Sequence, residues 1–550
     1  MDKITQKKLD FVILLLFSSF LIFWNLSSIS LWSPDEPRFG AIVRHMVREN
    51  DYLIPKFNGK NLYWKPILVY WLMAFPSKII NDATELTTRL PSALSALGII
   101  VAFFFFLKKY SSRKTAFLAG IILITNYTFL EQSRLAIIDM TLTFFMFLAT
   151  ISFYIGYINK EKRRKWFLLF YVFCGLSVLS KGPVGVIVPA LIVFFFLFSS
   201  RRLEVIKDMI LPSGMLLFLL ATLPWYIAAL LEGGREFFQE FIIKQNIIRF
   251  FHAFDHIQPF YYYLDRVATH FFPWSLLLPA ALILNWKDFK KEKETSSGKP
   301  SFFLFMWVWL LVVLFFFSIS KSKRSQYILL LYPAMSLAVA HLCVRFFTAR
   351  EKSDIPVSLL WIKVPLSLMC LLFGIFFIAF PSFVKFAGYF TSDFFVTSLF
   401  CSIVLVFLIF FIGEALTKKN PLHMGKSACA RMFLFAAAVS IFMVAGLYPE
   451  LDRIRSAVPY TKKINKAVGE DRLITFYFDR PEFIYYLDRG PIEVLEEDDV
   501  GKLMDYLRGK EKVYCLIRRR YYRDRLPYLK NVFHRVVLSD LKGWKWDLLL

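Results

Sequence analysis

Long apolar runs recur along the chain and constrain its fold more than any other feature. A helix needs about 20 apolar residues to cross the roughly 30 Å of hydrocarbon in a bilayer. Runs of suitable length begin near Phe11, Thr88, Thr115, Met140, Trp166, Val184, Leu211, Val267, Phe302, Tyr327, Leu359, Val396 and Met432. The sequence therefore predicts a polytopic α-helical membrane protein with about thirteen transmembrane helices.

The net charge of +25 comes mostly from short basic clusters between the apolar runs. On a soluble protein such a charge would point to nucleic acid, but 57% apolar and 18% aromatic residues place the chain among membrane proteins. The clusters fall on every second connection, as the positive-inside rule requires of cytoplasmic loops. We therefore expect a cytoplasmic amino terminus, an outer carboxyl terminus, contacts with membrane lipids and no nucleic-acid partner.

The character of the sequence changes near residue 451. Beyond it, charged segments alternate with short strand-like runs at 473–478, 513–517 and 536–538 and with a helical stretch at 498–507. Residues 451–550 are therefore predicted to form a small α/β domain on the outer face. Residues 1–450 are predicted to form a transmembrane domain, with outer loop helices within 31–80 and 231–266.

An adjacent carboxylate pair, Asp35 and Glu36, follows the first apolar run directly. Acidic groups at the end of a membrane span are costly and usually mark a site. Asp35 precedes a short amphipathic helix, so the structural alternative is that it serves as the N-cap. A cap accounts for one carboxylate but not for two. We therefore predict a catalytic or substrate-orienting role for Asp35 and for Glu36.

Two further residues have both a structural and a functional interpretation. Asp139 opens the fourth apolar run, where it either pairs with Arg134 or faces a polar cavity as a catalytic residue. Lys65 stands between Trp64 and Pro66 before a short aromatic run. In the structural interpretation, the Lys65 side chain reaches the membrane surface with its ammonium group and so anchors that run. In the functional interpretation, the ammonium group binds a lipid phosphate.

Several cations lie on the outer side, where the charge rule disfavours them. Lys181 occupies a Ser-Lys-Gly-Pro turn between two spans, and Arg249 lies in the long outer loop. Lys321 and Arg324, followed by Tyr327, form a further basic group. Such a group on this side calls for an anionic partner, so we predict these five residues as phosphate ligands.

Two histidines, His252 and His256, are four residues apart and could ligate a metal from one helical face. No third ligand follows at a useful spacing, so we predict no metal site and no cofactor. The sequence alone does not exclude the binding of a divalent metal ion. Nothing resembles a nucleotide-binding glycine loop, so the donor is not expected to be a cytosolic nucleotide. The remaining carboxylates, cations and aromatic residues suit a substrate with a phosphate and sugar hydroxyls.

Six motifs occur in the order found in a known family. They are Asp35-Glu36, Lys65-Pro66, Arg134-Leu135 with Asp139, Ser180-Lys181-Gly182-Pro183, Gln245-Asn246 with Arg249-Phe250, and a lysine followed by Gln326-Tyr327-Ile328-Leu329. In these motifs the chain resembles the bacterial branch of the protein-mannosyltransferase-like glycosyltransferases with the C-type membrane fold, and most closely the lipid A aminoarabinose transferases. The resemblance implies transfer of a sugar from a polyprenyl (undecaprenyl) phosphate carrier, at the periplasmic face of the inner membrane, to lipid A or another envelope glycan.

The resemblance also implies roles for single residues. By position, Asp35 resembles the essential carboxylate, Lys65 and Tyr327 resemble the carrier-phosphate ligands, and Asp139 resembles the second acidic residue of the cavity. Aminoarabinose transferases typically carry Glu-Lys-Pro and Glu-His where this chain has Trp64-Lys65-Pro66 and Gln245-Asn246. A carboxylate and an imidazole that can share a metal ion are therefore missing, and we expect no zinc site of that kind.

Two other functions stay open from the sequence. A transporter or flippase of polyprenyl-linked sugars would place its binding residues near the bilayer midplane, whereas here the polar residues gather at one face. An enzyme resembling the protein O-mannosyltransferases would use similar donor chemistry with a peptide acceptor.

Overall fold

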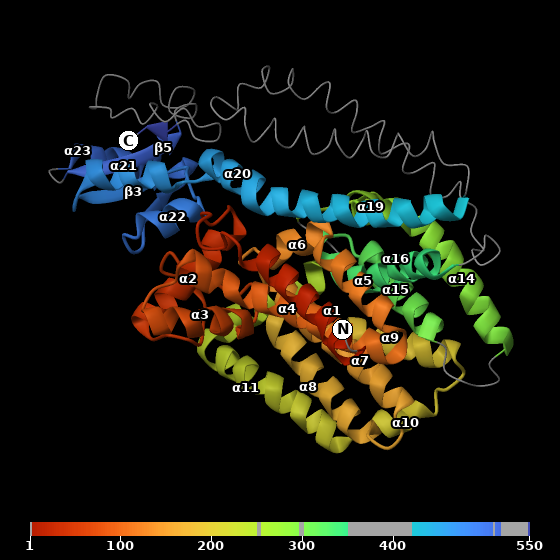
Figure 1. Ribbon diagram of the computed structural model, residues 1–550. Helices are drawn as coiled ribbons and strands as arrows, with labels where there is room; N and C mark the ends of the chain where they lie inside the picture. Colours follow the sequence, from red (N-terminus) through yellow and green to blue (C-terminus); the bar gives the residue numbers. More distant parts are fainter. Residues whose placement is uncertain are drawn as a thin grey trace.

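The computed structural model of the chain describes residues 3–249, 255–295, 302–349, 421–509, 512–518 and 548–549. Most helices run along a common direction, and a small sheet lies at one end of the bundle (Figure 1). Within these ranges, six helical stretches are long and apolar enough to cross a membrane. They are α4 (Glu85–Tyr110), α7 (Ile138–Ile158), α11 (Pro212–Phe237) with its extension η1 (Phe238–Ile248), α15 (Phe302–Ile319), α16 (Leu331–Thr348), and the stretch Lys426–Val468, which includes most of α19 (Pro421–Phe442).

The other helices of the bundle are shorter or less apolar. They are α1 (Lys3–Phe23), α5 (Arg113–Ile124), α6 (Tyr127–Ser133), α8 (Arg163–Lys181), α9 (Val184–Ser199), α10 (Val205–Met209), α13 (Tyr262–His270), η2 (Trp274–Leu276), α14 (Leu278–Thr295) and η3 (Ser325–Ile328). Phenylalanine, tyrosine and leucine side chains fill the spaces between them in one continuous core.

Most of the predicted runs coincide with one helix each, but two are divided. The run from Thr115 breaks where the Asn126 side chain accepts a hydrogen bond from the Phe129 amide, 2.8 Å away, and so begins α6. The run from Val267 breaks at Pro273, which has no amide hydrogen to continue the helix. The runs near Leu359 and Val396 lie outside the described residues, so the number thirteen stays a prediction.

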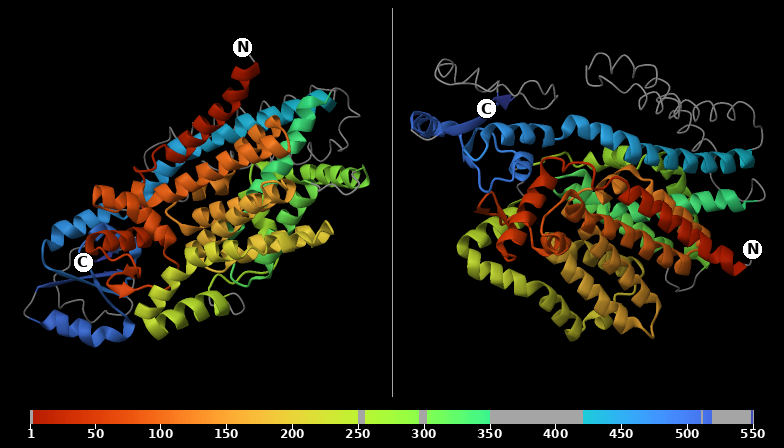
Figure 2. Two further views of the ribbon diagram at one scale, coloured as in Figure 1. Left: turned by 90° about the horizontal axis from the view of Figure 1, so that it is seen from below. Right: turned by 60° about the vertical axis from the view of Figure 1, so that its left-hand side comes forward.

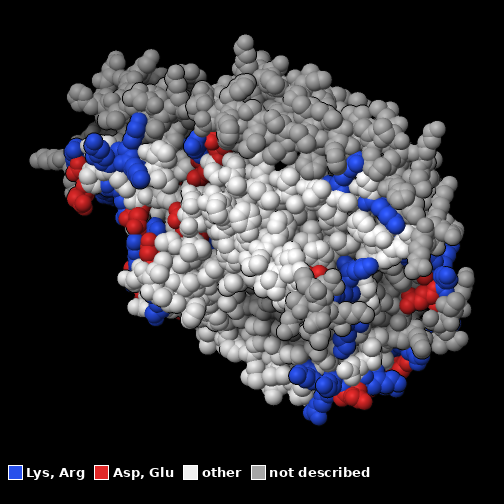
Figure 3. Space-filling view, viewed as in Figure 1, with Lys and Arg blue, Asp and Glu red and all other residues white. Residues whose placement is uncertain are grey.

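Charged residues are sorted to the two ends of the bundle. Figure 3 shows, on one face, a broad band without charges between charged groups around the sheet and charged groups near α10. The basic connections Lys108–Arg113, Lys160–Lys165 and Arg201–Lys207 lie at or just after the C-terminal ends of α4, α7 and α9, whereas Asp139 and Lys181 lie at or beside the N-terminal ends of α7 and α9. An uncharged belt between two charged ends is the surface that a bilayer-spanning protein needs.

The segment between α1 and α4 folds over the end of the bundle where the sheet lies. It contains α2 (Asp35–Glu49), the two-residue strands β1 (Lys56–Phe57) and β2 (Lys60–Asn61), and α3 (Leu68–Ile80). Ile42 and Met46, on the apolar face of α2, are fully buried, and the helix packs against α3. The helix ends at Asn50, whose φ of 52° is the left-handed conformation typical of a helix C-cap.

The C-terminal residues form a four-stranded sheet in the order β4-β3-β5-β6. Its strands are β3 (Arg472–Phe476), β4 (Glu493–Leu495), β5 (Val513–Arg518) and β6 (Leu548–Leu549), and β3 pairs in parallel with both β4 and β5. The accompanying helices are η5 (Met443–Leu447), α20 (Tyr448–Arg455), α21 (Val458–Val468), α22 (Pro481–Leu487), η6 (Glu497–Asp499) and α23 (Val500–Arg508). The strand predicted at 536–538 lies outside the described residues.

The sheet, α2 and α3 lie at the same end of the molecule. Two further directions of view agree on this arrangement (Figure 2). The connections that carry the predicted site residues alternate with the basic connections, so they lie toward this end as well.

Candidate functional site

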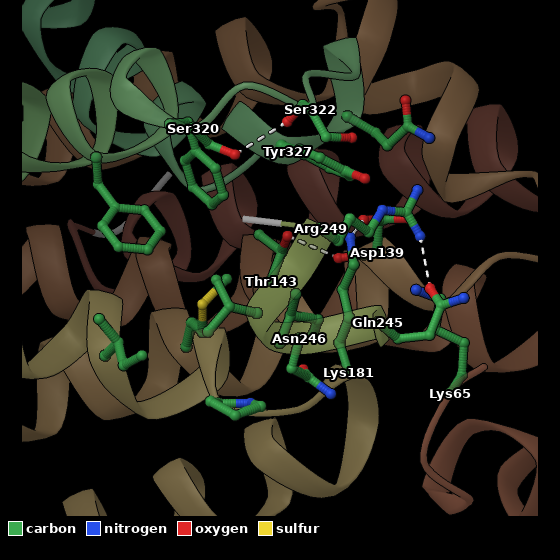
Figure 4. A pocket seen from close by; sticks show the side chains of 18 of the residues that line it. Lys65, Asp139, Thr143, Lys181, Gln245, Asn246, Arg249, Ser320, Ser322 and Tyr327 are labelled. Carbon is green, nitrogen blue, oxygen red and sulfur yellow. Dashed lines mark hydrogen bonds and ion pairs between the residues drawn. The ribbon is translucent and has the colours of Figure 1, made fainter. Parts of the chain in front are cut away.

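A cavity of about 450 Å³ opens between the ends of several helices. Its lining comes from residues before α3, from α7, the α8–α9 turn, η1, α15 and η3. Of the residues predicted from the sequence, five line it: Lys65, Asp139, Lys181, Arg249 and Tyr327. They come from five segments far apart in the sequence, and Figure 4 shows Asp139, Lys181, Arg249 and Tyr327 grouped close together.

Asp139 lies in the first turn of α7, where a carboxylate is favoured by the helix dipole. Its partner is Lys181, the last residue of α8, rather than Arg134. The Lys181 ammonium also lies 4.1 Å from the centroid of the Tyr327 ring, a cation–π contact. The predicted alternative of an Arg134–Asp139 pair is therefore wrong, and Arg134 donates to backbone carbonyls at the end of α1, including that of Leu21.

The turn after Lys181 needs glycine. Gly182 has a φ of +105°, and a Cβ on it would lie 2.8 Å from the Asn246 side-chain oxygen. The backbone can therefore reverse direction against η1 only because no side chain is present. This close approach brings Lys181 and Asn246 into the same cavity wall.

Lys65 is the cavity residue with the most perturbed charge. Burial, then the neighbouring charges of Lys181 and Arg249, lower the pKa of Lys65 to about 7. It makes no hydrogen bond or ion pair with any residue that the structure describes. An ammonium that is crowded by other cations in this way gains when an anion binds beside it.

Arg249 is held by Gln245, which belongs to the same sequence motif, and by Asp255, which the sequence did not single out. Its guanidinium donates to the side-chain oxygen of Gln245 and to Asp255, each at 2.9 Å. The other oxygen of Asp255 accepts a 3.2 Å hydrogen bond from the Ser322 hydroxyl. Asp255 thus joins the loop after η1 to the segment before η3, and no pattern in the sequence marks it.

Asp35 is the first residue of α2, and Pro34 occupies the cap position without a side-chain capping bond. The structural alternative of an N-cap is therefore wrong. The Asp35 carboxylate instead accepts a hydrogen bond of 3.1 Å from Arg324 and lies 3.7 Å from Arg38. Asp35 is not among the described residues that line the cavity, but its partner Arg324 stands three residues before Tyr327, which does line it.

Arg324 connects Asp35 to the cavity electrostatically. Burial of Arg324 opposes its charge, but Asp35, Tyr327 and Asp139 outweigh this effect and raise the pKa of the guanidinium. The second terminal nitrogen of Arg324 lies 2.7 Å from His256 Nε2. An arginine can only donate, so His256 accepts this hydrogen bond as the neutral ring.

Two predicted residues lie elsewhere. The Glu36 carboxylate is only 2% exposed and pairs with Arg89 in α4, at 2.8 and 2.9 Å. It also accepts from the backbone amides of Trp32 and Ala136. Lys321 is exposed and is not among the described residues lining the cavity. This geometry favours a structural role for Glu36 and a peripheral one for Lys321.

A metal ligand set is not found in the part of the chain that the structure describes. No group of three His, Cys, Asp or Glu side chains there could hold an ion. His256 is engaged by Arg324, and His252 lies outside the described residues.

The cavity is amphiphilic. One part carries the cations described above, and the remainder is lined by apolar side chains of α7, α9 and α15, namely Leu142, Met146, Val184, Ile187, Phe316 and Phe317. A ligand that matches both parts has an anionic head and a long apolar chain. A phosphate would meet Lys65, Lys181 and Arg249. Asp139 pairs with Lys181 and Asp255 with Arg249, whereas Lys65 has no anionic partner among the described residues.

Comparison with known proteins gives a consistent result. Residues 64–227 match the family described as dolichyl-phosphate-mannose-protein mannosyltransferase. The chain is 32% identical over 288 residues to the undecaprenyl phosphate-alpha-4-amino-4-deoxy-L-arabinose arabinosyl transferase of Aeromonas hydrophila, covering 51% of each chain. It thus spans about half the length of such relatives. An uncharacterized protein of Aquifex aeolicus is 31% identical over 336 residues, which are 61% of this chain and 73% of that one.

A solved structure extends the likeness to nearly the whole chain. The crystal structure of ArnT from Cupriavidus metallidurans bound to undecaprenyl phosphate has a TM-score of 0.75, at 18% identity, covering 98% of this chain and 97% of that chain. At this identity the likeness is one of fold.

Proposed function

Because the chain belongs to the protein-mannosyltransferase-like glycosyltransferases with the C-type membrane fold, we propose that it transfers a sugar from a polyprenyl phosphate carrier, such as undecaprenyl phosphate, to an acceptor. The acceptor is lipid A or another glycan of the cell envelope. The reaction takes place at the periplasmic face of the bacterial inner membrane, with the amino terminus in the cytoplasm. Residues 451–550 form a periplasmic domain in this proposal, and residues 1–450 the transmembrane domain.

The observation that supports this function is the amphiphilic cavity. Its cationic part suits the carrier phosphate, and its apolar part suits the first units of the polyprenyl chain. Lys65, Arg249 and Tyr327 bind the phosphate, with Lys181 held against Tyr327 by Asp139. A transporter would need polar residues near the middle of the bilayer, and the clustering of the charged lining at the helix ends does not favour it.

In the proposed reaction, the acceptor oxygen attacks the anomeric carbon while the bond between that carbon and the phosphate oxygen breaks. The negative charge that develops on the departing phosphate is stabilised by Lys65 and Arg249, which are positioned before the reaction begins. Asp35 accepts the proton of the acceptor hydroxyl, and the result is a single displacement with inversion. If the acceptor is itself a phosphate, Asp35 instead stabilises the positive charge on the sugar.

The direct test is transfer by the purified protein in lipid vesicles. A radiolabelled polyprenyl-phosphate-linked sugar is supplied with lipid A, with an extracted envelope glycan, with a peptide, or with none of these, and the label is followed. The proposal expects label on lipid A or an envelope glycan. Label on the peptide would favour a protein O-mannosyltransferase-like enzyme, and label that crosses the bilayer without transfer would favour a flippase.

A further inference from the structure

The C-terminal part of the chain, from α20 to β6, includes helix α22. This helix packs directly against α2, the helix that begins with Asp35. The two helices lie next to each other in Figure 1. At Gly40 the two helices approach closely: a Cβ on this residue would lie 2.8 Å from the Tyr485 ring and 2.8 Å from Leu31. A glycine one and a half turns after Asp35 therefore admits the ring of a residue from the other end of the chain.

Arg44 makes several contacts where α2 meets α22. Its guanidinium donates to Asp82 at 2.9 Å and to the Tyr485 carbonyl at 2.7 Å, and it stacks on the Tyr485 ring at 4.1 Å. The Tyr485 hydroxyl donates in turn to the carbonyl of Ala83 at 2.6 Å. Because Arg44 is on α2 and Ala83 leads into α4, Tyr485 joins α2 to the membrane bundle.

The last turn of α2 is held by a second contact. Arg48 makes two parallel hydrogen bonds of 2.7 and 2.8 Å with the carboxylate of Asp488, the residue that follows α22. Paired bonds of this kind fix orientation as well as distance.

The residues that lead into α2 are held by the same C-terminal part. The Leu31 amide donates to the Tyr486 hydroxyl at 2.6 Å, and that hydroxyl donates to Glu85 at 2.9 Å. Asp452 of α20 accepts from the Ser30 amide at 3.1 Å and from the Trp32 indole at 3.0 Å. The C-terminal part therefore contacts the chain both before and after Asp35.

We propose that the C-terminal part is a positioning element of the transfer site, which fixes α2 and so places the Asp35 carboxylate against Arg324 beside the cavity. The proposal rests on the function proposed above and assigns positioning roles to Arg44, Tyr485 and Tyr486. It leaves the phosphate ligands of the cavity untouched, because the contacts described fall on α2, on residues 30–32 and on Ala83 and Glu85, none of which lines the cavity. Loss of these contacts should therefore slow turnover without weakening carrier binding.

The kinetic test uses the full-length protein in vesicles, with undecaprenyl phosphate as the binding probe. Arg44→Ala and Tyr485→Ala should lower kcat by roughly tenfold to a hundredfold, as expected for a reacting group misplaced by about an ångström. Affinity for undecaprenyl phosphate should stay within about twofold, since its ligands are unchanged. Tyr485→Phe keeps the ring and should retain most activity, and Tyr486→Phe, which removes one oxygen atom, should show a smaller loss of kcat.

The matched control is Arg472→Ala, which breaks the 2.9 Å pair with Glu493 inside the C-terminal sheet and leaves α2 alone. It should keep the wild-type kcat. Wild-type kcat in both Arg44→Ala and Tyr485→Ala would overturn the proposal, as would a parallel loss of carrier binding and kcat, which indicates general disruption.

A second measurement does not depend on turnover. Spin labels on Glu49 of α2 and Leu264 of α13, both exposed, report the distance between α2 and the bundle. The distance distribution should broaden in Arg44→Ala and not in Arg472→Ala, and equal distributions would overturn the positioning role. Absence of transfer by the wild-type protein would count against the proposed function alone, because the distance measurement would still decide the positioning role.

Discussion

The Arg324 guanidinium donates a 3.1 Å hydrogen bond to the Asp35 carboxylate, across 289 residues of sequence. The pair joins α2 to the segment that supplies Tyr327 to the cavity wall. A carboxylate held by one arginine keeps a second oxygen for another partner, here close to Arg38 at 3.7 Å. This arrangement leaves Asp35, which is about one-third exposed, available to an acceptor hydroxyl.

Replacement of Asp35 by asparagine tests its role as the base. Asp35→Asn keeps the shape of the side chain but removes its basicity, so kcat should fall by about 10²-fold to 10⁴-fold. Affinity for undecaprenyl phosphate should change little, because Asp35 is not among the described residues of the cavity lining. The control is Asp51→Asn. Asp51 is a carboxylate in the same segment of the chain, and it pairs with Lys56. Near-normal turnover of Asp35→Asn would remove Asp35 from the mechanism.

The pH dependence of donor binding tests Lys65. Its pKa is lowered to about 7, so in the free protein the ammonium loses its proton as the pH rises above that value. A bound phosphate favours the charged form, and binding above pH 7 must therefore include uptake of a proton. With a sugar-linked carrier, whose phosphodiester charge is constant, affinity should fall by at most about tenfold per pH unit above 7.

The control for this prediction is Lys65→Arg, because arginine stays charged throughout this range. Its affinity should be nearly independent of pH between 7 and 9, measured by equilibrium binding of the labelled donor. Equal pH slopes in the wild type and in Lys65→Arg would show that the relevant proton lies elsewhere.

Protonation of His256 should lower both the stability and the kcat of the protein at acid pH. Burial and the charge of Arg324 lower the pKa of His256 below its usual 6.5, so the folded protein binds this proton less tightly than the unfolded chain does. Its contribution to stability is therefore complete above 6.5 and decreases as the pH falls through the lowered value. Protonation also removes the acceptor for Arg324 and places two cations side by side.

The measurement is the pH profile of kcat and of the melting temperature, between pH 5 and 8, for the wild type and His256→Gln. Glutamine can still accept a hydrogen bond from Arg324 but does not titrate. The pH profiles of His256→Gln should therefore fall less steeply on the acid side than those of the wild type. An unchanged acid limb would mean that another group controls it.

The sequence could predict that five site residues converge, because basic and non-basic connections alternate along the chain. These residues are Lys65, Asp139, Lys181, Arg249 and Tyr327. Once the basic clusters assign every second connection to one side, the remaining connections must meet at the other. Which of their side chains touch each other was not predictable. Asp139 pairs with Lys181, 42 residues later, rather than with Arg134, because the packing of α7 on α8 decides the partner.

Two other features depend on tertiary contacts that leave no local pattern. Asp255 positions Arg249 from an irregular segment, where neither helical nor strand periodicity exists to mark it. Arg89 lies just inside an apolar run, where no local pattern marks it, yet it is 2% exposed and pairs with Glu36. Within the described residues the apolar runs predicted the helices, except at Asn126 and Pro273, where polar capping and a missing amide end a run that is still apolar.

The Glu36–Arg89 pair leads to a prediction about stability rather than rate. Glu36 accepts two hydrogen bonds from Arg89 and two from backbone amides, and Arg89 also donates to the carbonyls of Leu26, Ile29 and Ser30. Glu36→Ala leaves a buried guanidinium without its counter-charge, which should destabilise the protein by about 3–5 kcal/mol. A lower melting temperature in detergent would register this loss.

The double variant Glu36→Ala with Arg89→Met separates the two roles that the sequence left open for Glu36. The double variant has no unpaired Arg89 guanidinium. Its melting temperature should therefore lie above that of Glu36→Ala and below that of the wild type. If Glu36 serves only the fold, the recovered protein should also regain turnover, because Asp35 and the cavity keep their residues. Recovery of the melting temperature without recovery of kcat would instead place Glu36 in the chemistry.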